Sequence, residues 1–269
     1  MGVQDATEQR DSEERSLRVV LAQLEAAPRD LAANAAAIRD VLGAHPAAEL
    51  AVFPELFLCG YTTDRVDELA LPLDDPLLAE LCEACRSHGT AVVVGFAERD
   101  GAAVRNSLVI LDADGRMAAV YRKRNLFGAE AEAFAAGDAD VLGDAAGAVI
   151  GPLICFDIEF PEPARRLAFA GAELLVSIAA NMEPYHADHE LASRARALDN
   201  RRPHVYVNAV GEAEGLRFVG GSRAVRPDGS VVVELGSSSA VVEVGLPLGE
   251  AVAPAVDYLR FLRESEHER

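Results

Sequence analysis

The 269-residue chain lacks any apolar stretch approaching the roughly 20 residues that a membrane-spanning helix needs. Its first 16 residues are polar and contain no apolar core, so we do not expect a secretory signal there. Basic side chains are scarce, because 25 Lys and Arg face 44 Asp and Glu, for a formal net charge of −19. So acidic a chain is poorly suited to bind nucleic acid or an anionic membrane. We therefore expect a cytoplasmic protein that acts on small molecules.

The chain also lacks a Gly/Ser-rich or Pro-rich linker and any internal repeat. Half of its residues are hydrophobic, which is enough for a sizeable core at this length. We therefore predict one domain over residues 17–248. Residues 1–16 are expected to be a disordered polar tail, and residues 249–269 a C-terminal tail or short amphipathic helix.

Only four cysteines are present, in a chain that we expect to be intracellular. We therefore expect free thiols and not a disulfide framework. Cys82 and Cys85 form a CxxC pair, but no second pair accompanies them. Their spacing places both on one face of a predicted helix, which favours core packing over metal binding or redox chemistry. Cys59 either lines a site near Glu55 or packs in the core.

The distribution of apolar residues predicts alternating strands and helices. The predicted strands are Leu17–Gln23, Leu50–Phe53, Ala91–Phe96, Val104–Leu111, Met117–Tyr121, Ala148–Cys155, Leu174–Ala179, Val205–Val210, Phe218–Val225, Val231–Leu235 and Ala240–Val244. The predicted helices are Asp30–Ala44, Pro76–His88, Pro161–Ala170 and His186–Arg202, the last with Leu191, Ala195 and Leu198 on its apolar face. Several strands are almost continuously apolar, which indicates a layered α/β architecture with both faces covered.

Cys155 stands between a predicted strand and a predicted helix, in the segment GPLICFDIEFPE of residues 151–162. An apolar run leads into Cys155, and Pro161 with Glu162 fits the first turn of a helix. A side chain at such a junction lies beside unpaired backbone N–H groups, which suits a thiolate nucleophile next to an oxyanion site. A buried structural cysteine is the alternative.

Two charged residues also follow predicted strands directly. Glu55 comes after Leu50–Phe53 in VFPELFLCGY, and Lys123 comes after Met117–Tyr121 in YRKRNLFG. Side chains at the ends of strands can meet at one edge of a sheet. Glu55, Lys123 and Cys155 are therefore candidates for a single site.

Together these segments resemble the nitrilase, or carbon–nitrogen hydrolase, superfamily. The similar motifs are Phe53-Pro54-Glu55 with Gly60-Tyr61, Tyr121-Arg122-Lys123, and Cys155-Phe156-Asp157 with Phe160-Pro161-Glu162. Each motif is weak alone, but their order and spacing are specific, and the resemblance covers roughly residues 17–245. It implies a four-layer α-β-β-α sandwich and amidase activity from a Glu–Lys–Cys triad without a cofactor. The CFDIEFPE segment is most similar to that of the small aliphatic and stereoselective amidases.

The resemblance also implies a role for each residue of the triad. Cys155 would be the nucleophile, and Glu55 would take its proton, pass it to the leaving ammonia and then activate water. Lys123, as a cation, would lower the pKa of the thiol. It would also stabilise the oxyanion, with the N–H of Phe156 as a second donor.

Further site residues follow from the same resemblance. A second glutamate usually lies seven residues after the lysine, which selects Glu130, with Glu132 as its rival. Tyr61, Phe156 and Asn181 fall where the family contacts the substrate or supports the triad. Asn125 departs from the pattern, because the family usually has His at this position.

Two hypotheses that assign the chain to other functional classes stay open. A papain-like cysteine hydrolase would need His186 or His189 as the base beside Cys155, although no peptidase motif accompanies them. A catalytically dead scaffold is the second, and the intact triad argues against it. No GxSxG motif suggests a serine hydrolase. The six scattered histidines complete no metal site, so we predict that catalysis needs no metal.

The substrate is expected to be a small carboxamide, with an N-carbamoyl compound second and a nitrile third. Nitrilases of the superfamily usually carry Trp-Glu after the cysteine, whereas Cys155 is followed by Phe156 and Asp157. An N-carbamoyl amino acid would require a cation for its carboxylate, for which the candidates are Arg105, Arg124 and Arg217. The resemblance further implies a homodimer or higher homo-oligomer, with the C-terminal tail at the interface.

Overall fold

The computed structural model describes residues 15–248 and 258–267. Most of the two predicted tails lies outside the described residues. The predicted tail boundary is one residue too late, since Ser16 already belongs to strand β1 (Ser16–Gln23). A C-terminal helix, α6 (Tyr258–His267), contacts α5, and the Arg201 guanidinium lies 4.5 Å from the centroid of the Tyr258 ring.

One six-stranded sheet is built mainly from the N-terminal half of the chain. Its strand order is β14 (Ala240–Pro247), β1, β2 (Leu50–Val52), β3 (Ala91–Asp100), β4 (Ala103–Leu111) and β5 (Met117–Arg122). Strands β1, β2 and β3 are parallel, and their neighbours on both sides are antiparallel. Strands β2 and β5 end at the same side of the molecule. Glu55 and Lys123, which follow these two strands, meet there.

A second six-stranded sheet follows in the chain. Its strand order is β13 (Val231–Glu234), β12 (Arg223–Val225), β9 (His204–Asn208), β8 (Leu174–Ala179), β7 (Ala148–Ile154) and β6 (Gly143–Ala145). The three central strands β7, β8 and β9 are parallel and almost entirely buried. This agrees with the continuous apolar runs from which buried strands were predicted.

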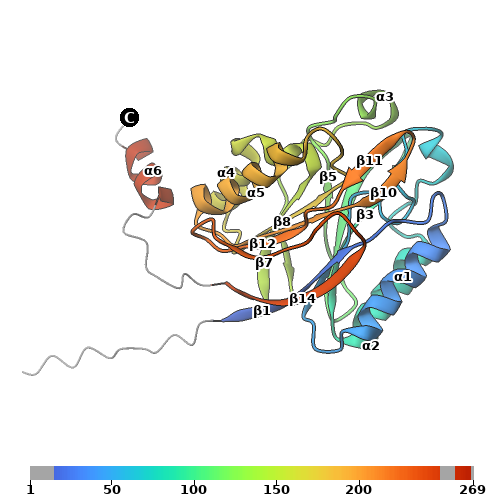
Figure 1. The fold of residues 1–269 in the computed structure, drawn as a ribbon, viewed down its shortest axis with the longest axis horizontal. Helices are drawn as coiled ribbons and strands as arrows, with labels where there is room; N and C mark the ends of the chain where they lie inside the picture. Colours follow the sequence, from blue (N-terminus) through green and yellow to red (C-terminus); the bar gives the residue numbers. More distant parts are fainter. Residues whose placement is uncertain (1–14, 249–257, 268–269) are drawn as a thin grey trace, which may run out of the picture.

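The two sheets pack face to face, and helices cover both outer faces (Figure 1). A core of apolar side chains from both sheets, including Leu21, Val52, Ile154 and Val176, fills the space between them. Helices α1 (Leu31–Ala44) and α2 (Pro76–His88) lie on the first sheet, and α4 (Pro161–Ala170) and α5 (His186–Asn200) on the second. The predicted α-β-β-α sandwich is therefore confirmed.

Local sequence signals explain where these helices begin and end. The Asp30 carboxylate accepts a hydrogen bond from the N–H of Ala33 at the start of α1, and Asp75 caps α2 in the same way. Gly89 and Gly171 end α2 and α4 in the left-handed conformation, with φ of 66° and 110°.

Two of the predicted strands are each divided in two. The predicted strand Phe218–Val225 is interrupted by Gly220 and Gly221, whose positive φ angles of 64° and 71° break the extended backbone. Its halves are β12 and β11 (Leu216–Val219), and β11 pairs with β10 (Val210–Ala213) in a separate two-stranded sheet. The predicted strand Val205–Val210 similarly supplies the end of β9 and the start of β10.

The predicted apolar face of α5 is not its buried face. Leu191 is 71% exposed and Leu198 37% exposed, whereas His189, Ser193 and Arg196 are buried. The helix packs inward through small and polar side chains, of which His189 bonds the Tyr206 hydroxyl and Ser193 accepts from Arg223 on the second sheet. Hydrophobic periodicity alone therefore predicted the wrong face of α5 as the buried one.

The described part of the chain has no helix that is both long enough and apolar enough to cross a membrane.

Candidate active site

Three strand ends bring the predicted triad to one place. Glu55 follows β2, Lys123 follows β5 on the same sheet, and Cys155 follows β7 on the opposite sheet. The backbone N–H of Lys123 donates to the carbonyl of Asn106 on β4 over 2.8 Å, which extends the sheet contact up to the lysine. The site thus lies where the two sheets of the sandwich meet.

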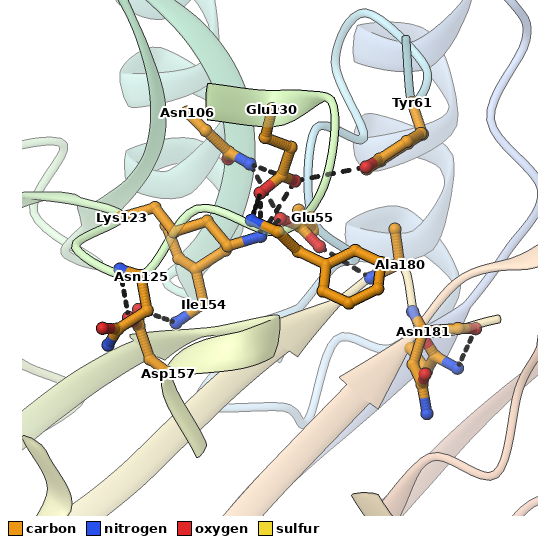
Figure 2. Close-up of polar contacts among 12 residues, drawn as sticks. Glu55, Tyr61, Asn106, Lys123, Asn125, Glu130, Ile154, Asp157, Ala180 and Asn181 are labelled. Carbon is orange, nitrogen blue, oxygen red and sulfur yellow. Dashed lines mark hydrogen bonds and ion pairs between the residues drawn. The ribbon is translucent and has the colours of Figure 1, made fainter. Parts of the chain in front are cut away.

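The Glu55 carboxylate is almost completely buried and bridges the two sheets (Figure 2). Its Oε1 accepts from Lys123 Nζ at 2.6 Å and from Asn106 Nδ2 at 2.7 Å. Its Oε2 accepts from the backbone N–H of Ala180, just after β8 of the other sheet, at 2.8 Å. These three donors fix the orientation of the carboxylate.

Glu130 lies on the other side of the lysine, at the start of the short helix α3 (Glu130–Ala133). Its two oxygens accept from Lys123 Nζ at 2.9 and 2.7 Å, and Oε1 also accepts from the Tyr61 hydroxyl at 3.2 Å. Its rival Glu132 is exposed. Glu130 therefore contacts the lysine, and Tyr61 in turn contacts Glu130 (Figure 2).

Cys155 begins a short 3-10 turn, η2 (Cys155–Glu159), with φ of 46°. Non-glycine residues rarely adopt this left-handed conformation, and it occurs often at functional sites. The buried Asp157 carboxylate supports the turn, because it accepts from the N–H of Ile154 at 3.1 Å and from the Tyr121 hydroxyl at 2.8 Å. Asn125 Nδ2 donates to the same carboxylate at 2.8 Å. The residue that departs from the family pattern therefore helps to hold the carboxylate that supports the turn.

Burial and the charges around it shift the pKa of the Cys155 thiol. Burial, together with the negative charge of Glu55, raises this pKa well above its usual value, and Lys123 only partly opposes the shift. Lys123 thus acts on this pKa in the expected direction, but burial and two carboxylates outweigh one ammonium group, so the net shift is upward. The Cys155 thiol is therefore protonated at neutral pH.

Lys123 shows the opposite balance. Burial lowers its pKa, but the negative charges of Glu55 and Glu130 oppose burial, and the pKa lies well above the usual value. The lysine therefore stays cationic at neutral pH. Burial raises the pKa of Glu130, and Lys123 opposes this shift.

A cleft of about 300 Å³ opens onto Cys155 and Lys123. Its other lining residues are mostly aromatic or polar, namely Tyr61, Phe127, Glu130, Phe156, Glu159, Ala180, Asn181, Met182, Tyr185 and His189. The four predicted accessory residues Glu130, Phe156, Asn181 and Tyr61 all line it. The Asn181 side chain is held by the Tyr185 carbonyl, to which its Nδ2 donates at 3.1 Å.

Several other candidates lie away from the cleft. Cys59 and Cys85 pack in separate apolar clusters, and burial raises the pKa of each to about 12. Cys82 packs partly against the same cluster as Cys85, as the helix spacing predicted. His189 does line the cleft, but its ring binds the Tyr206 hydroxyl at 2.9 Å and Glu159 at 3.3 Å.

The three arginines considered for a substrate carboxylate also lie elsewhere. Arg105 pairs with Asp100 at 2.7 Å, Arg124 pairs with Asp140 at 2.7 Å, and Arg217 lies near Glu183 in an exposed pair. None of them lines the cleft. Within residues 15–248 and 258–267, no group of three or more His, Cys, Asp or Glu side chains could hold a metal ion.

Sequence reasoning missed Asn106 and Ala180. Asn106 is fully buried on β4, and it donates both to Glu55 and, at 3.3 Å, to Glu130. Asparagine is depleted in strands, so its presence within Ala103–Leu111 was the available signal. Ala180 acts through its backbone N–H, which side-chain chemistry does not reveal.

Comparison with known proteins places this fold and site in one class of enzyme. The carbon–nitrogen hydrolase family model matches residues 18–253. The (R)-stereoselective amidase of a Pseudomonas sp. is 40% identical over 216 residues, which are 79% of this chain and 78% of that protein. A protein named "Hydrolase in pqqF 5'region", from Pseudomonas protegens, is 38% identical over 234 residues, or 85% of this chain and 82% of that protein.

Solved structures agree with the sequence relatives. An amidase from Nesterenkonia sp. superposes with a TM-score of 0.82 at 29% identity, covering 94% of this chain and 95% of that one. A mutant of the amidase from Nesterenkonia sp. AN1 shows covalent addition of the acetamide moiety of fluoroacetamide at its active-site cysteine. It superposes with a TM-score of 0.83 at 28% identity, covering 95% of this chain and 97% of that one.

The sandwich fold and the cysteine-containing site together define a hydrolase of the nitrilase superfamily. The chain belongs to the carbon–nitrogen hydrolase family, and among the proteins similar to it are ones named amidases. The family predicted from the three motifs is confirmed.

Proposed function

We propose that this enzyme hydrolyses a small carboxamide to the carboxylic acid and ammonia through a thioester on Cys155. One observation carries the proposal. Cys155, Lys123 and Glu130 line one cleft, and Glu55 lies buried behind it, bonded to the lysine. The alkylated cysteine of the Nesterenkonia sp. AN1 amidase mutant supports the assignment of the nucleophile.

The first step transfers the thiol proton and forms the carbon–sulfur bond. Since the raised pKa keeps Cys155 protonated at rest, the thiol needs a base, and Glu55 accepts the proton as Sγ attacks the amide carbon. The cationic Lys123 and the N–H of Phe156 stabilise the negative oxygen of the tetrahedral intermediate. Glu130 accepts a hydrogen bond from the Lys123 ammonium group and holds this group in place.

The second half of the reaction returns the enzyme to its starting state. Glu55 gives its proton to the amide nitrogen, the C–N bond breaks and ammonia leaves the thioester. Glu55 then removes a proton from water as the water oxygen attacks the thioester carbon. When the C–S bond breaks, Glu55 returns this proton to the Cys155 sulfur and the carboxylic acid departs.

The surroundings of the cleft support an amide over the two related substrates. An N-carbamoyl amino acid carries a carboxylate, and Arg105, Arg124 and Arg217 all lie outside the cleft. The Phe156-Asp157 sequence after the nucleophile differs from the Trp-Glu usual in nitrilases. We therefore keep the order of amide, N-carbamoyl compound and nitrile.

The test compares kcat/KM for matched amide, N-carbamoyl and nitrile compounds through the ammonia they release. We expect the amide to be hydrolysed fastest and Lys123→Met to lower its kcat/KM by about 10²–10³-fold, as loss of an oxyanion donor does. Mass spectrometry of a quenched reaction should find the acyl group on Cys155. A nitrile that exceeds the amide by tenfold or more would overturn the proposal. The homodimer and the cytoplasmic location remain predictions.

A further inference from the structure

The cleft contains a carboxylate that the proposed mechanism does not use. Glu159 lies four residues after Cys155, at the end of the η2 turn, and lines the same cleft. Its Oε1 lies 3.3 Å from Nε2 of His189, and its side chain is 29% exposed. Among the hydrogen bonds and ion pairs of the described residues, none engages its second oxygen. That oxygen can therefore accept a hydrogen bond from a ligand.

The imidazole of His189 holds Glu159 without cancelling its charge. Burial lowers the pKa of His189, so the ring is neutral at neutral pH. Its Nδ1 lies 2.9 Å from the hydroxyl of Tyr206, a hydroxyl that also bonds the side chain of Asn181. These contacts assign the tautomer in which Nε2–H donates to Glu159 and Nδ1 accepts from Tyr206. The carboxylate is thus positioned by a chain of neutral groups.

The charges around the cleft do not balance. Among the residues that the structure describes, Lys123 is the one Lys or Arg that lines it. Both Glu55 and Glu130 already pair with this lysine, so these three groups together carry one negative charge. Glu159 adds a second. A ligand carboxylate would meet repulsion in this cleft, whereas a ligand cation would be attracted.

We propose that Glu159 determines substrate specificity, by selecting carboxamides that bear an ammonium group a few bonds from the amide and rejecting those that bear a carboxylate. This inference rests on the proposed amide hydrolysis, and it narrows the substrate class from small amides to amino-substituted amides. A charge-assisted hydrogen bond from the ammonium to the open oxygen of Glu159 supplies the preference.

Three amides of the same chain length test the proposal: 3-aminopropanamide, butanamide and succinamate, which end in an ammonium, a methyl group and a carboxylate. We expect kcat/KM to fall in that order, with the ammonium compound ahead of the methyl compound by at least about tenfold, the effect of one hydrogen bond to a charged group. In Glu159→Gln this ratio should collapse toward one. Glu162→Gln, which removes an exposed carboxylate three residues away, should keep the wild-type ratio.

A second measurement does not depend on hydrolysis. The rates at which 2-bromoethylamine, iodoacetamide and iodoacetate alkylate Cys155 report how the cleft treats a cation, a neutral molecule and an anion. Normalised to the rates with free cysteine, they should fall in that order for the wild type. In Glu159→Gln the three normalised rates should converge.

The outcomes separate this inference from the proposed function. Hydrolysis of all three amides with similar kcat/KM would overturn the role of Glu159 and leave amide hydrolysis standing. Hydrolysis of none, with a Glu159-dependent preference in alkylation, would overturn amide hydrolysis and support the charge selectivity. If Glu159→Gln does not fold, the wild-type order alone decides, and an ammonium compound that is no better than butanamide contradicts the proposal.

Discussion

The side-chain amide of Asn106 lies 2.7 Å from the same Glu55 oxygen that accepts the hydrogen bond from Lys123. The amide therefore holds the carboxylate from the strand side while the lysine holds it from the cleft side. Both contacts are fully buried, where a lost hydrogen bond is not replaced by water.

We predict that Asn106→Leu lowers kcat/KM about 10–100-fold, because the proton-transferring carboxylate loses one of its three donors. The two side chains have the same number and branching of heavy atoms, although leucine is larger, so a measurement of stability must accompany the kinetics. Steady-state kinetics and thermal unfolding should be measured together. A variant that folds normally and retains the wild-type kcat/KM would show that Asn106 does not orient Glu55.

Replacing Cys155 should separate the nucleophile from the other thiols. Cys155→Ala is expected to remove essentially all ammonia release, whereas Cys82→Ala, on the partly buried face of α2, should leave it nearly intact. Cys85→Ala should also remain active, with some loss of stability from its buried site. Retained turnover in Cys155→Ala would end the nucleophile hypothesis.

Glu55→Gln tests the general base against the papain-like alternative. It keeps the shape of the side chain but cannot accept the thiol proton, so we expect kcat to fall about 10²–10⁴-fold. His186→Ala serves as the comparison, because His186 lies outside the cleft lining and should matter less. The opposite ranking of the two variants would favour histidine as the base.

The buried His204 predicts how stability depends on pH. Its ring bonds the Ser177 hydroxyl at 2.6 Å and the Ser193 carbonyl at 2.8 Å, and burial lowers its pKa to about 4. Between pH 4 and the unfolded pKa near 6.5, the unfolded chain binds a proton that the folded protein does not. The stability contributed by the neutral ring is therefore complete above pH 6.5 and is lost as the pH falls, by about 3 kcal/mol at pH 4.

Urea unfolding between pH 7 and pH 4 measures this dependence. The slope of the unfolding free energy against pH should be smaller in His204→Gln than in the wild type, whatever the stability of the variant at pH 7. Equal slopes would mean that His204 titrates alike in the folded and unfolded states.

Removal of metal ions should not affect catalysis. The proposed chemistry uses a thiol, a carboxylate and an ammonium group, which together supply the nucleophile, the base and the oxyanion partner. We expect full kcat/KM after incubation with EDTA and buffer exchange. Activity that is lost to the chelator and restored by one particular divalent ion would contradict this.

Much of the site could be predicted because its main residues follow strands that are visible in the sequence. Glu55, Lys123 and Cys155 each come directly after an apolar run, and this position depends on local sequence alone. Asn106 was missed because it lies within a strand and its importance depends on what the neighbouring strands bring to it. The raised pKa of Cys155 was also out of reach, since it results from burial and from the positions of charges in three dimensions.

The fold shows the same division between local and distant causes. Gly89 and Gly171 end helices through their own backbone freedom, and the predicted helices Pro76–His88 and Pro161–Ala170 end immediately before them. The break at Gly220 was not predicted, because a glycine can also lie within a regular strand. The outward position of Leu191 depends on the polar partners of α5 in the second sheet, which the sequence of the helix does not contain.

The contact between Glu55 and Ala180 makes the chemistry sensitive to the distance between the layers of the protein. Each sheet keeps its own ladder of hydrogen bonds, but the proposed base, Glu55, follows a strand of one sheet and is oriented by an N–H that follows a strand of the other. Mild denaturant or heat that loosens the packing between the sheets should therefore abolish turnover while circular dichroism still shows intact strands. Loss of activity would then serve as an early gauge of separation between the two halves of the sandwich.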